Sequence, residues 1–222
     1  MGFELFITNL FGDADQRFFF FCVVITVIVS IVLHELAHGW AAIRLGDDTP
    51  IRLDRMTGNP LVHMGPYSLL GLAVFGIAWG QMPVDPTRMR GRYCDAQVAV
   101  AGPAMNVLLA IVTLTSLALW IRFGGFATGP GVAENGQTFL RIAGIYNLVL
   151  AAFNLLPAPP LDGSRILGDF VEKYRRFAFD PANQGAMLLA FFFAFAVAGR
   201  ILVPWCRDLA DHYVLFVLTV GA

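Results

Sequence analysis

Two histidines and a glutamate stand close together in the sequence His34-Glu35-Leu36-Ala37-His38. In a helix, a spacing of four residues places both imidazoles on one face, about one turn apart. Two zinc ligands need this geometry, and Glu35 then lies near the remaining coordination position. The simpler interpretation is a group of buried polar residues that join helices. Because ionisable groups inside an apolar segment are costly and usually functional, the motif instead predicts a zinc centre.

A catalytic zinc ion takes three protein ligands and a water molecule, so a third ligand must come from elsewhere in the chain. Asp162 has the most suitable context among the downstream carboxylates, since it closes the run Asn154-Leu-Leu-Pro-Ala-Pro-Pro-Leu-Asp162-Gly163. The prolines of this run remove backbone donors and break the helix at the end of an apolar stretch. The alternative is that Asp162 caps a helix beginning at Gly163.

The composition predicts a membrane protein around this centre. The chain has 222 residues, of which 57% are hydrophobic and 14% charged, and its mean hydropathy is +0.67. A soluble domain usually carries about 25% charged residues. The net charge of −1 lacks the basic excess that binding to nucleic acid requires. We therefore expect an all-α polytopic membrane protein in contact with the lipid bilayer, with no nucleic-acid partner.

The apolar stretches divide residues 1–222, a single membrane-embedded core, into about five to six transmembrane helices with short loops. Residues 67–80 are apolar but too short to cross a bilayer as a helix, so 67–84 is interpreted as a re-entrant segment, with a β-hairpin as one form of it. Residues 123–140 are interpreted as a glycine-rich loop. The remaining predicted elements are an interfacial segment 1–17, a span 18–45, a span 96–121, a broken span 141–172 and C-terminal spans within 186–222, of which residues 213–222 are left open.

Arginine and lysine residues indicate the orientation. They occur in the loops at 44–66, 81–95 and 158–180, whereas the stretch 123–140 has none. The positive-inside rule then places the first three loops on the cytoplasmic side, provided that 67–80 does not cross the membrane. The active site is expected toward the cytoplasmic side of a multi-pass protein of the cell (inner) membrane.

Three sequence segments together resemble one family of enzymes. HELAHG at 34–39, AGPAMN at 101–106 and FNLLPAPPLDGSRIL at 153–167 resemble the site-2 protease family of intramembrane zinc metalloproteases. Asn59-Pro60 with His63, and the stretch 79–84, resemble motifs of its compact branch, which lacks PDZ and CBS domains.

The resemblance implies one Zn²⁺ per chain, held by His34, His38 and Asp162, with Glu35 as the general base acting on a zinc-activated water. It implies an endopeptidase that cuts single-span membrane proteins within or near their transmembrane helix, in regulated intramembrane proteolysis. Residues 67–84 would then be the membrane-inserted hairpin region that receives the substrate. The family's pattern has an acidic residue two positions after His63, where this chain has Gly65.

Three further polar residues are weaker candidates. Asn106 and Asn154 lie within apolar spans, where they either hold the substrate backbone or the oxyanion, or form ordinary interhelical hydrogen bonds. His63 lies in a polar stretch, and a fourth ligand would close a catalytic zinc site. A gating role, or support of a metal ligand, is therefore the functional interpretation of His63.

Two other functions remain as alternatives. A membrane zinc protease of the prenyl-protein-processing type also uses the His-Glu-x-x-His motif, but its third ligand is a later glutamate, for which only Glu134 and Glu172 are available. A non-hydrolytic transporter or metal-binding scaffold would also contain broken helices and intramembrane charges. No inverted repeat is visible in the sequence. The substrate's identity, an adaptor protein and the oligomeric state are not predicted.

Overall fold

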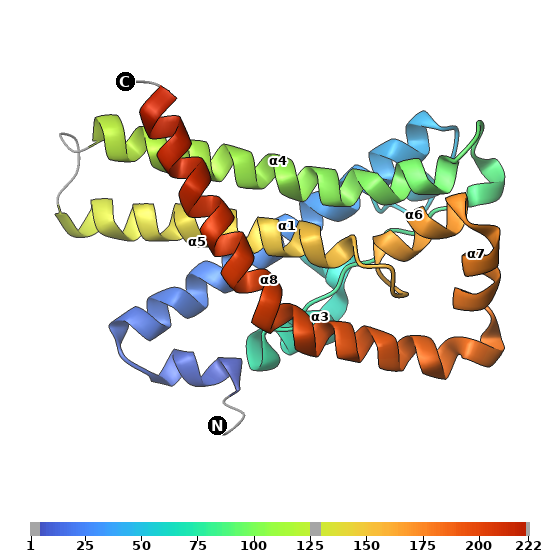
Figure 1. The fold of residues 1–222 in the computed structure, drawn as a ribbon, viewed down its shortest axis with the longest axis horizontal. Helices are drawn as coiled ribbons and strands as arrows, with labels where there is room; N and C mark the ends of the chain where they lie inside the picture. The colour runs from blue at the N-terminus through green and yellow to red at the C-terminus, as the bar shows by residue number, and fades with distance from the viewer. Residues whose placement is uncertain (1–4, 125–129, 221–222) are drawn as a thin grey trace.

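Four long helices form the body of the protein. A computed structural model describes residues 5–124 and 130–220, and within these ranges the chain is helical and contains no strand. The long helices are α1 (Ala14–Arg44), α4 (Cys94–Phe123), α5 (Pro130–Asn154) and α8 (Gln184–Val220). The shorter elements are η1 (Phe6–Phe11), α2 (Thr49–Arg52), α3 (Pro60–Phe75), η2 (Pro86–Arg88), α6 (Asp162–Phe170), α7 (Glu172–Ala178) and η4 (Pro181–Asn183). Figure 1 shows α4 and α5 running side by side, with α1 packed against both and α8 crossing them.

The prediction of an all-helical membrane protein is confirmed. Three helical stretches of the described residues are long and apolar enough to cross a membrane, namely Ala14–Arg44, Cys94–Phe123 and Pro181–Val220. The expected count of five to six spans stays a prediction. The first span begins at a capping box, in which the Asp13 carboxylate accepts from the Gln16 amide at 2.8 Å and the Gln16 side chain accepts from the Asp13 amide at 3.1 Å. This start lies four residues before the predicted residue 18.

The loop predicted at 123–140 is wrong over most of its length. Residues 130–140 form the first turns of α5, while 125–129 lie outside the described residues. One glycine of the predicted loop is a contact point between helices, because a Cβ at Gly136 would overlap the Trp120 ring. Gly144, farther along α5, makes a similar contact, since a Cβ there would overlap Leu114. Small residues let membrane helices approach closely, so these glycines allow α5 to lie directly against α4.

The β-hairpin considered for residues 67–84 does not form in the described part of the chain. Residues 67–75 continue α3, which ends at Gly76 with a left-handed C-cap (φ 71°), and the stretch 77–85 has no regular structure. The Ser68 hydroxyl accepts a hydrogen bond from Trp79 N at 2.8 Å and donates one to Trp79 O at 2.6 Å. A helix side chain thus satisfies both backbone groups that a second strand would have paired.

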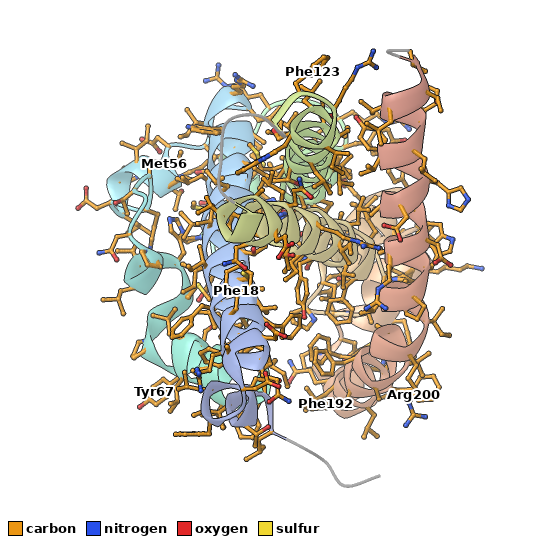
Figure 2. All side chains as sticks on the ribbon, turned by 90° about the vertical axis from the view of Figure 1, so that its left-hand side faces the viewer. Phe18, Met56, Tyr67, Phe123, Phe192 and Arg200 are labelled. Atoms are coloured by element: carbon orange, nitrogen blue, oxygen red, sulfur yellow. The ribbon has the colours of Figure 1, made fainter. Side chains whose placement is uncertain are left out.

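The C-terminal spans predicted within 186–222 are one helix as far as Val220. Figure 1 shows that α8 changes direction about midway, and Pro204, which cannot donate to the preceding turn, lies in its interior. Figure 2 shows α3 on one side of α1 and α8 on the opposite side of the bundle, with Phe192 and Arg200 at the outer edge. The phenylalanines of α8 are largely exposed, Phe193 by 72%, as expected for a surface that contacts lipid.

Asp47 connects the end of α1 to the loop that follows the 77–84 stretch. Its fully buried carboxylate accepts from Thr49 N at 2.9 Å and from Asp85 N at 2.7 Å. Burial acts to raise the pKa of the Asp47 carboxyl, but the hydrogen bonds from Thr49 and Asp85 outweigh it and lower the pKa below its ordinary value. Asp47 therefore stays ionised and holds the loop at Asp85 against the C-terminal end of α1.

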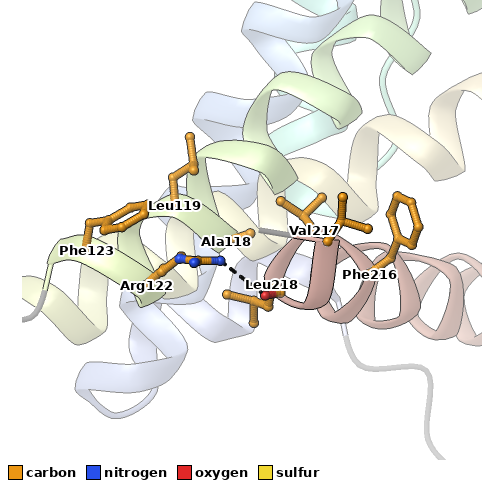
Figure 3. A pocket seen from close by; sticks show the side chains of 8 residues that line it. Ala118, Leu119, Arg122, Phe123, Phe216, Val217 and Leu218 are labelled. Atoms are coloured by element: carbon orange, nitrogen blue, oxygen red, sulfur yellow. Dashed lines mark hydrogen bonds between the residues drawn. The ribbon is translucent and has the colours of Figure 1, made fainter. Parts of the chain in front are cut away.

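The C-terminal ends of α4 and α8 line an open apolar cavity of about 390 Å³ (Figure 3). Arg122 donates from Nη1 to the Leu218 carbonyl at 3.4 Å across this contact. The cavity lies on the last turns of α4, whereas the sequence motif AGPAMN lies on its first half. The cavity is therefore remote from the predicted chemistry.

Candidate metal centre

Helix α1 presents His34, Glu35 and His38 from one buried turn. The three residues are 7%, 7% and 5% exposed. The two imidazole rings are nearly perpendicular, at 84°, and their Nε2 atoms are 3.0 Å apart. The spacing of four residues therefore produces the predicted pair of adjacent ring nitrogens.

Asp162 reaches the histidines as the first residue of α6. Its Oδ2 lies 3.1 Å from His34 Nε2, and its Oδ1 lies 3.3 Å from His38 Nε2. Leu161, not Asp162, occupies the N-cap position of α6, so the capping alternative does not describe this carboxylate.

Two features hold α6 in this position. A Cβ at Gly163 would overlap the Leu155 carbonyl, so a glycine lets α6 fold back tightly against the end of α5. Farther along α6, Arg165 pairs with Asp95, and the Asp169 carboxylate accepts from Ala96 N at 3.0 Å, which anchors α6 to the first turn of α4.

The arrangement fits a cation with two nitrogen ligands and one oxygen ligand. One ligand atom from each of His34, His38 and Asp162 lies within 4.8 Å of the others. Helix α4 passes beside this group at Gly102, where a Cβ would overlap both Nε2 atoms. Two imidazoles and one carboxylate leave a fourth position open, as in catalytic zinc sites.

Each imidazole is also held at its other nitrogen. His34 Nδ1 lies 2.6 Å from Asn106 Oδ1, and His38 Nδ1 lies 2.7 Å from the Val98 carbonyl. Asn106 in turn donates from Nδ2 to Asn147 Oδ1 at 3.1 Å. Hydrogen bonds of this kind orient metal-binding histidines.

Sequence reasoning missed two of these partners. Val98 acts through its backbone carbonyl, for which a sequence offers no signal. Asn147 is a buried amide in an apolar helix, seven residues before Asn154, and its polarity at that depth was an available signal.

The other two weak candidates lie elsewhere. Asn154 donates from Nδ2 to Leu150 O at 2.9 Å within its own helix. His63 is buried on α3, where its Nε2 lies 2.7 Å from Thr57 O and its carbonyl accepts from Gln81 N at 3.0 Å. The described contacts place neither residue in the His34–His38–Asp162 cluster.

Glu35 faces the irregular segment that follows α3, residues 77–84. A Cβ at Gly80 would overlap Glu35 Oε1, so backbone alone lies against the carboxylate. The Ser68–Trp79 hydrogen bonds fix the neighbouring residue of this segment. The 77–84 segment therefore lies directly against the Glu35 side chain at Gly80.

A buried cluster of two histidines, one aspartate and an adjacent glutamate, within a bundle of membrane-length helices, defines the class of membrane-embedded metallohydrolases. The comparisons with known proteins specify the family. Residues 124–198 match peptidase family M50, a stretch that includes Asp162 but not the histidine pair of α1.

The curated relatives match longer stretches of the chain. The chain is 39% identical over 156 residues to YwhC of Bacillus subtilis, covering 67% of this chain and 68% of YwhC. It is 31% identical over 193 residues to Rip2 of Mycobacterium tuberculosis, covering 82% and 71%. The zinc metalloprotease MJ0392 of Methanocaldococcus jannaschii is 26% identical over 206 residues, covering 90% of this chain and 51% of MJ0392. No solved structure matches the chain. The chain belongs to peptidase family M50, the site-2 proteases, and is an integral membrane protein.

Proposed function

We propose that the chain is an intramembrane zinc endopeptidase that hydrolyses peptide bonds within or near the transmembrane helix of single-span proteins, in regulated intramembrane proteolysis. The observation that carries the proposal is the convergence of His34, His38 and Asp162 beside Glu35. The relatives' names, which contain the words zinc metalloprotease, support zinc as the metal.

The roles of the residues follow from their chemistry. Bound zinc supplies a Lewis acid that activates water and polarises the scissile carbonyl. Glu35 is the general base, which takes the proton from the attacking water and passes it to the leaving amine. His34, His38 and Asp162 hold the metal, and the hydrogen bonds at Asn106 and Val98 keep the imidazoles in place.

The substrate helix must unwind before cleavage, because its peptide bonds are otherwise satisfied within the helix. The 77–84 segment supports a role in holding the unwound chain, since it passes over Glu35 at Gly80 without a side chain in between. An extended peptide can pair with free backbone groups of such a segment. The arginine-rich loops at 44–66 and 81–95 support a site toward the cytoplasmic side of the cell membrane.

The alternative with a glutamate ligand has less support. Glu172 begins α7 and pairs with Arg175 and Arg176, at 2.7 and 2.8 Å, and Glu134 is exposed in the first turns of α5. Asp162 is the carboxylate that faces the two imidazoles. The transporter alternative is tested by the activity of the Glu35 variant described in the Discussion.

Zinc removal tests the proposal directly. The purified protein, reconstituted into liposomes with a single-span peptide, should cleave it, lose this activity on treatment with a zinc chelator and regain it when zinc is restored. Wild-type protein should contain about one zinc ion per chain, and Asp162→Ala less than about one tenth of that, because a catalytic site needs three ligands. Mass spectrometry of the products locates the cut.

The matched control for this experiment is Asp208→Ala, which removes an exposed carboxylate of α8 that is not part of the cluster. This variant should keep its zinc. Full zinc retention in Asp162→Ala would contradict the assigned ligand set, and a wild-type protein that neither binds zinc nor cleaves any membrane peptide would contradict the function.

Ser68→Ala should weaken substrate binding without changing the zinc content. The variant loses both hydrogen bonds that hold Trp79, and so frees the 77–84 segment. We expect KM for the single-span peptide to rise at least about fivefold, since each of the two lost hydrogen bonds is worth about 1 kcal/mol, or a factor of about five. Ser116→Ala is the control, because that hydroxyl donates only to Val112 O of its own helix. An unchanged KM in Ser68→Ala would mean that the segment does not hold substrate.

A further inference from the structure

A chain of three hydrogen bonds begins at a backbone carbonyl of α5 and ends at a metal-facing imidazole of α1. Asn147 donates from Nδ2 to Ala143 O at 2.9 Å. A carbonyl oxygen only accepts hydrogen bonds, so the NH₂ group of Asn147 must face Ala143. Its Oδ1 must therefore face the other way, toward α4.

The orientation of the Asn147 amide also determines the orientation of the Asn106 amide. Asn147 Oδ1 can only accept, and Asn106 Nδ2 donates to it at 3.1 Å. Asn106 Oδ1 is thereby turned toward His34 Nδ1, at 2.6 Å. An amide oxygen in this position requires a proton on His34 Nδ1, so that Nε2 is the nitrogen whose lone pair is available to a cation held between His34, His38 and Asp162.

We infer that Asn147 is a positioning residue that fixes the tautomer of His34 through Asn106, and so delivers His34 Nε2 to the metal as a ligand. The inference rests on the proposed function, because a neutral Nε2 lone pair is what a zinc ligand provides. His38 needs no intermediate side chain to fix its tautomer, since its Nδ1 lies directly against the Val98 carbonyl.

The burial of the two amides explains why an anchor is needed. Asn106 and Asn147 are 0% and 2% exposed, so water does not supply a substitute partner. An amide group that rotates by half a turn exchanges its oxygen for its NH₂ with almost no change in shape. If Asn106 turned in this way, its NH₂ would face His34 Nδ1 and favour the tautomer with the proton on Nε2, in which Nε2 has no lone pair for a metal.

The relay is the hydrogen-bonded series Ala143–Asn147–Asn106–His34. Two variants of Asn147 distinguish the loss of its hydrogen bonds from a change in side-chain volume. Asn147→Leu keeps the approximate volume but removes both the donor and the acceptor. Asn147→Asp, protonated in this buried position, still donates to Ala143 O and accepts from Asn106. Thr113→Val is the control, because the Thr113 hydroxyl donates only to carbonyls of its own helix, α4.

The first measurement is the zinc dissociation constant of each full-length protein in detergent. Loss of a hydrogen bond that orients a metal ligand typically costs about 10–100-fold in affinity, and we expect this loss in Asn147→Leu. Asn147→Asp and Thr113→Val should remain close to wild type. The second measurement is nitrogen NMR of ¹⁵N-histidine in the metal-free proteins, which should show His34 protonated on Nδ1 in wild type and as a mixture of tautomers in Asn147→Leu.

The outcomes distinguish this inference from the function on which it rests. Wild-type protein that binds no zinc would overturn both. Wild type that binds zinc, while Asn147→Leu binds it equally well, would overturn the relay alone. The relay would also fail if His34 of metal-free wild type carried no proton on Nδ1, a result that needs no variant to fold. Zinc lost equally from Asn147→Leu and Asn147→Asp would indicate a packing role and overturn it too.

Discussion

Replacing Glu35 by Gln is expected to stop peptide hydrolysis while zinc remains bound. Glutamine has the size of glutamate and preserves the contact with Gly80, but its amide cannot take a proton from water. General-base catalysis contributes about 10²–10⁴-fold, so kcat should fall by about this factor. The measurement is the rate of cleavage of the reconstituted single-span peptide, together with the zinc content of the same preparation.

This variant also separates a protease from a transporter or a metal-binding scaffold. Glu134→Gln is the matched control, because it makes the same chemical change at an exposed position on α5. The control should cleave at the wild-type rate. If Glu35→Gln cleaved as fast as its control, Glu35 would not be the base. If both proteins transported an ion and cleaved nothing, the transporter alternative would be correct.

Gly102→Ala is expected to eliminate zinc binding, although alanine favours the helix. Alanine is more stable than glycine in a helix interior by about 1 kcal/mol, so α4 itself should form at least as readily. The added methyl group would, however, overlap Nε2 of both His34 and His38. Either the imidazoles turn away or α4 moves away from α1, and in both cases the metal position is lost.

The measurement is zinc stoichiometry, which should fall from about one per chain to near zero, with activity lost in parallel. Gly199→Ala is the matched control, a helical glycine of α8 with open space around its Cβ position. It should keep both zinc and activity. Retention of zinc in Gly102→Ala would show that α4 does not pass this close to the two histidines.

The residues of the cluster could be predicted from the sequence because their signals are local. The spacing of His34 and His38 specifies one helix face whatever the rest of the fold does. Asp162 stands out because prolines interrupt the apolar stretch just before it. The two spans 18–45 and 96–121 were predictable for a similar reason, since their length and hydropathy need no tertiary information. Helix α1 contains the first as far as Arg44, and α4 contains the whole of the second.

What the sequence did not reveal depends on contacts between distant helices. Gly136 lies in a stretch with the composition of a loop, and only the proximity of Trp120 makes it a helical packing position. Likewise, the 77–84 segment lacks a partner strand because Ser68 has already satisfied Trp79. The importance of Asn147 appears only when α5 is placed against α4.

The order in which the site is assembled has a consequence for biosynthesis. His34 and Asp162 are 128 residues apart in the chain. A nascent chain of which only α1 to α4 have been translated contains both histidines but not the carboxylate of Asp162. Under the proposed ligand set, such an intermediate is catalytically silent, because two ligands do not make a catalytic zinc site. Under this ligand set, the newly made protease cannot cleave neighbouring membrane proteins until α5 and α6 have been translated and have packed against α1 and α4. The order of the helices in the chain therefore sets the delay.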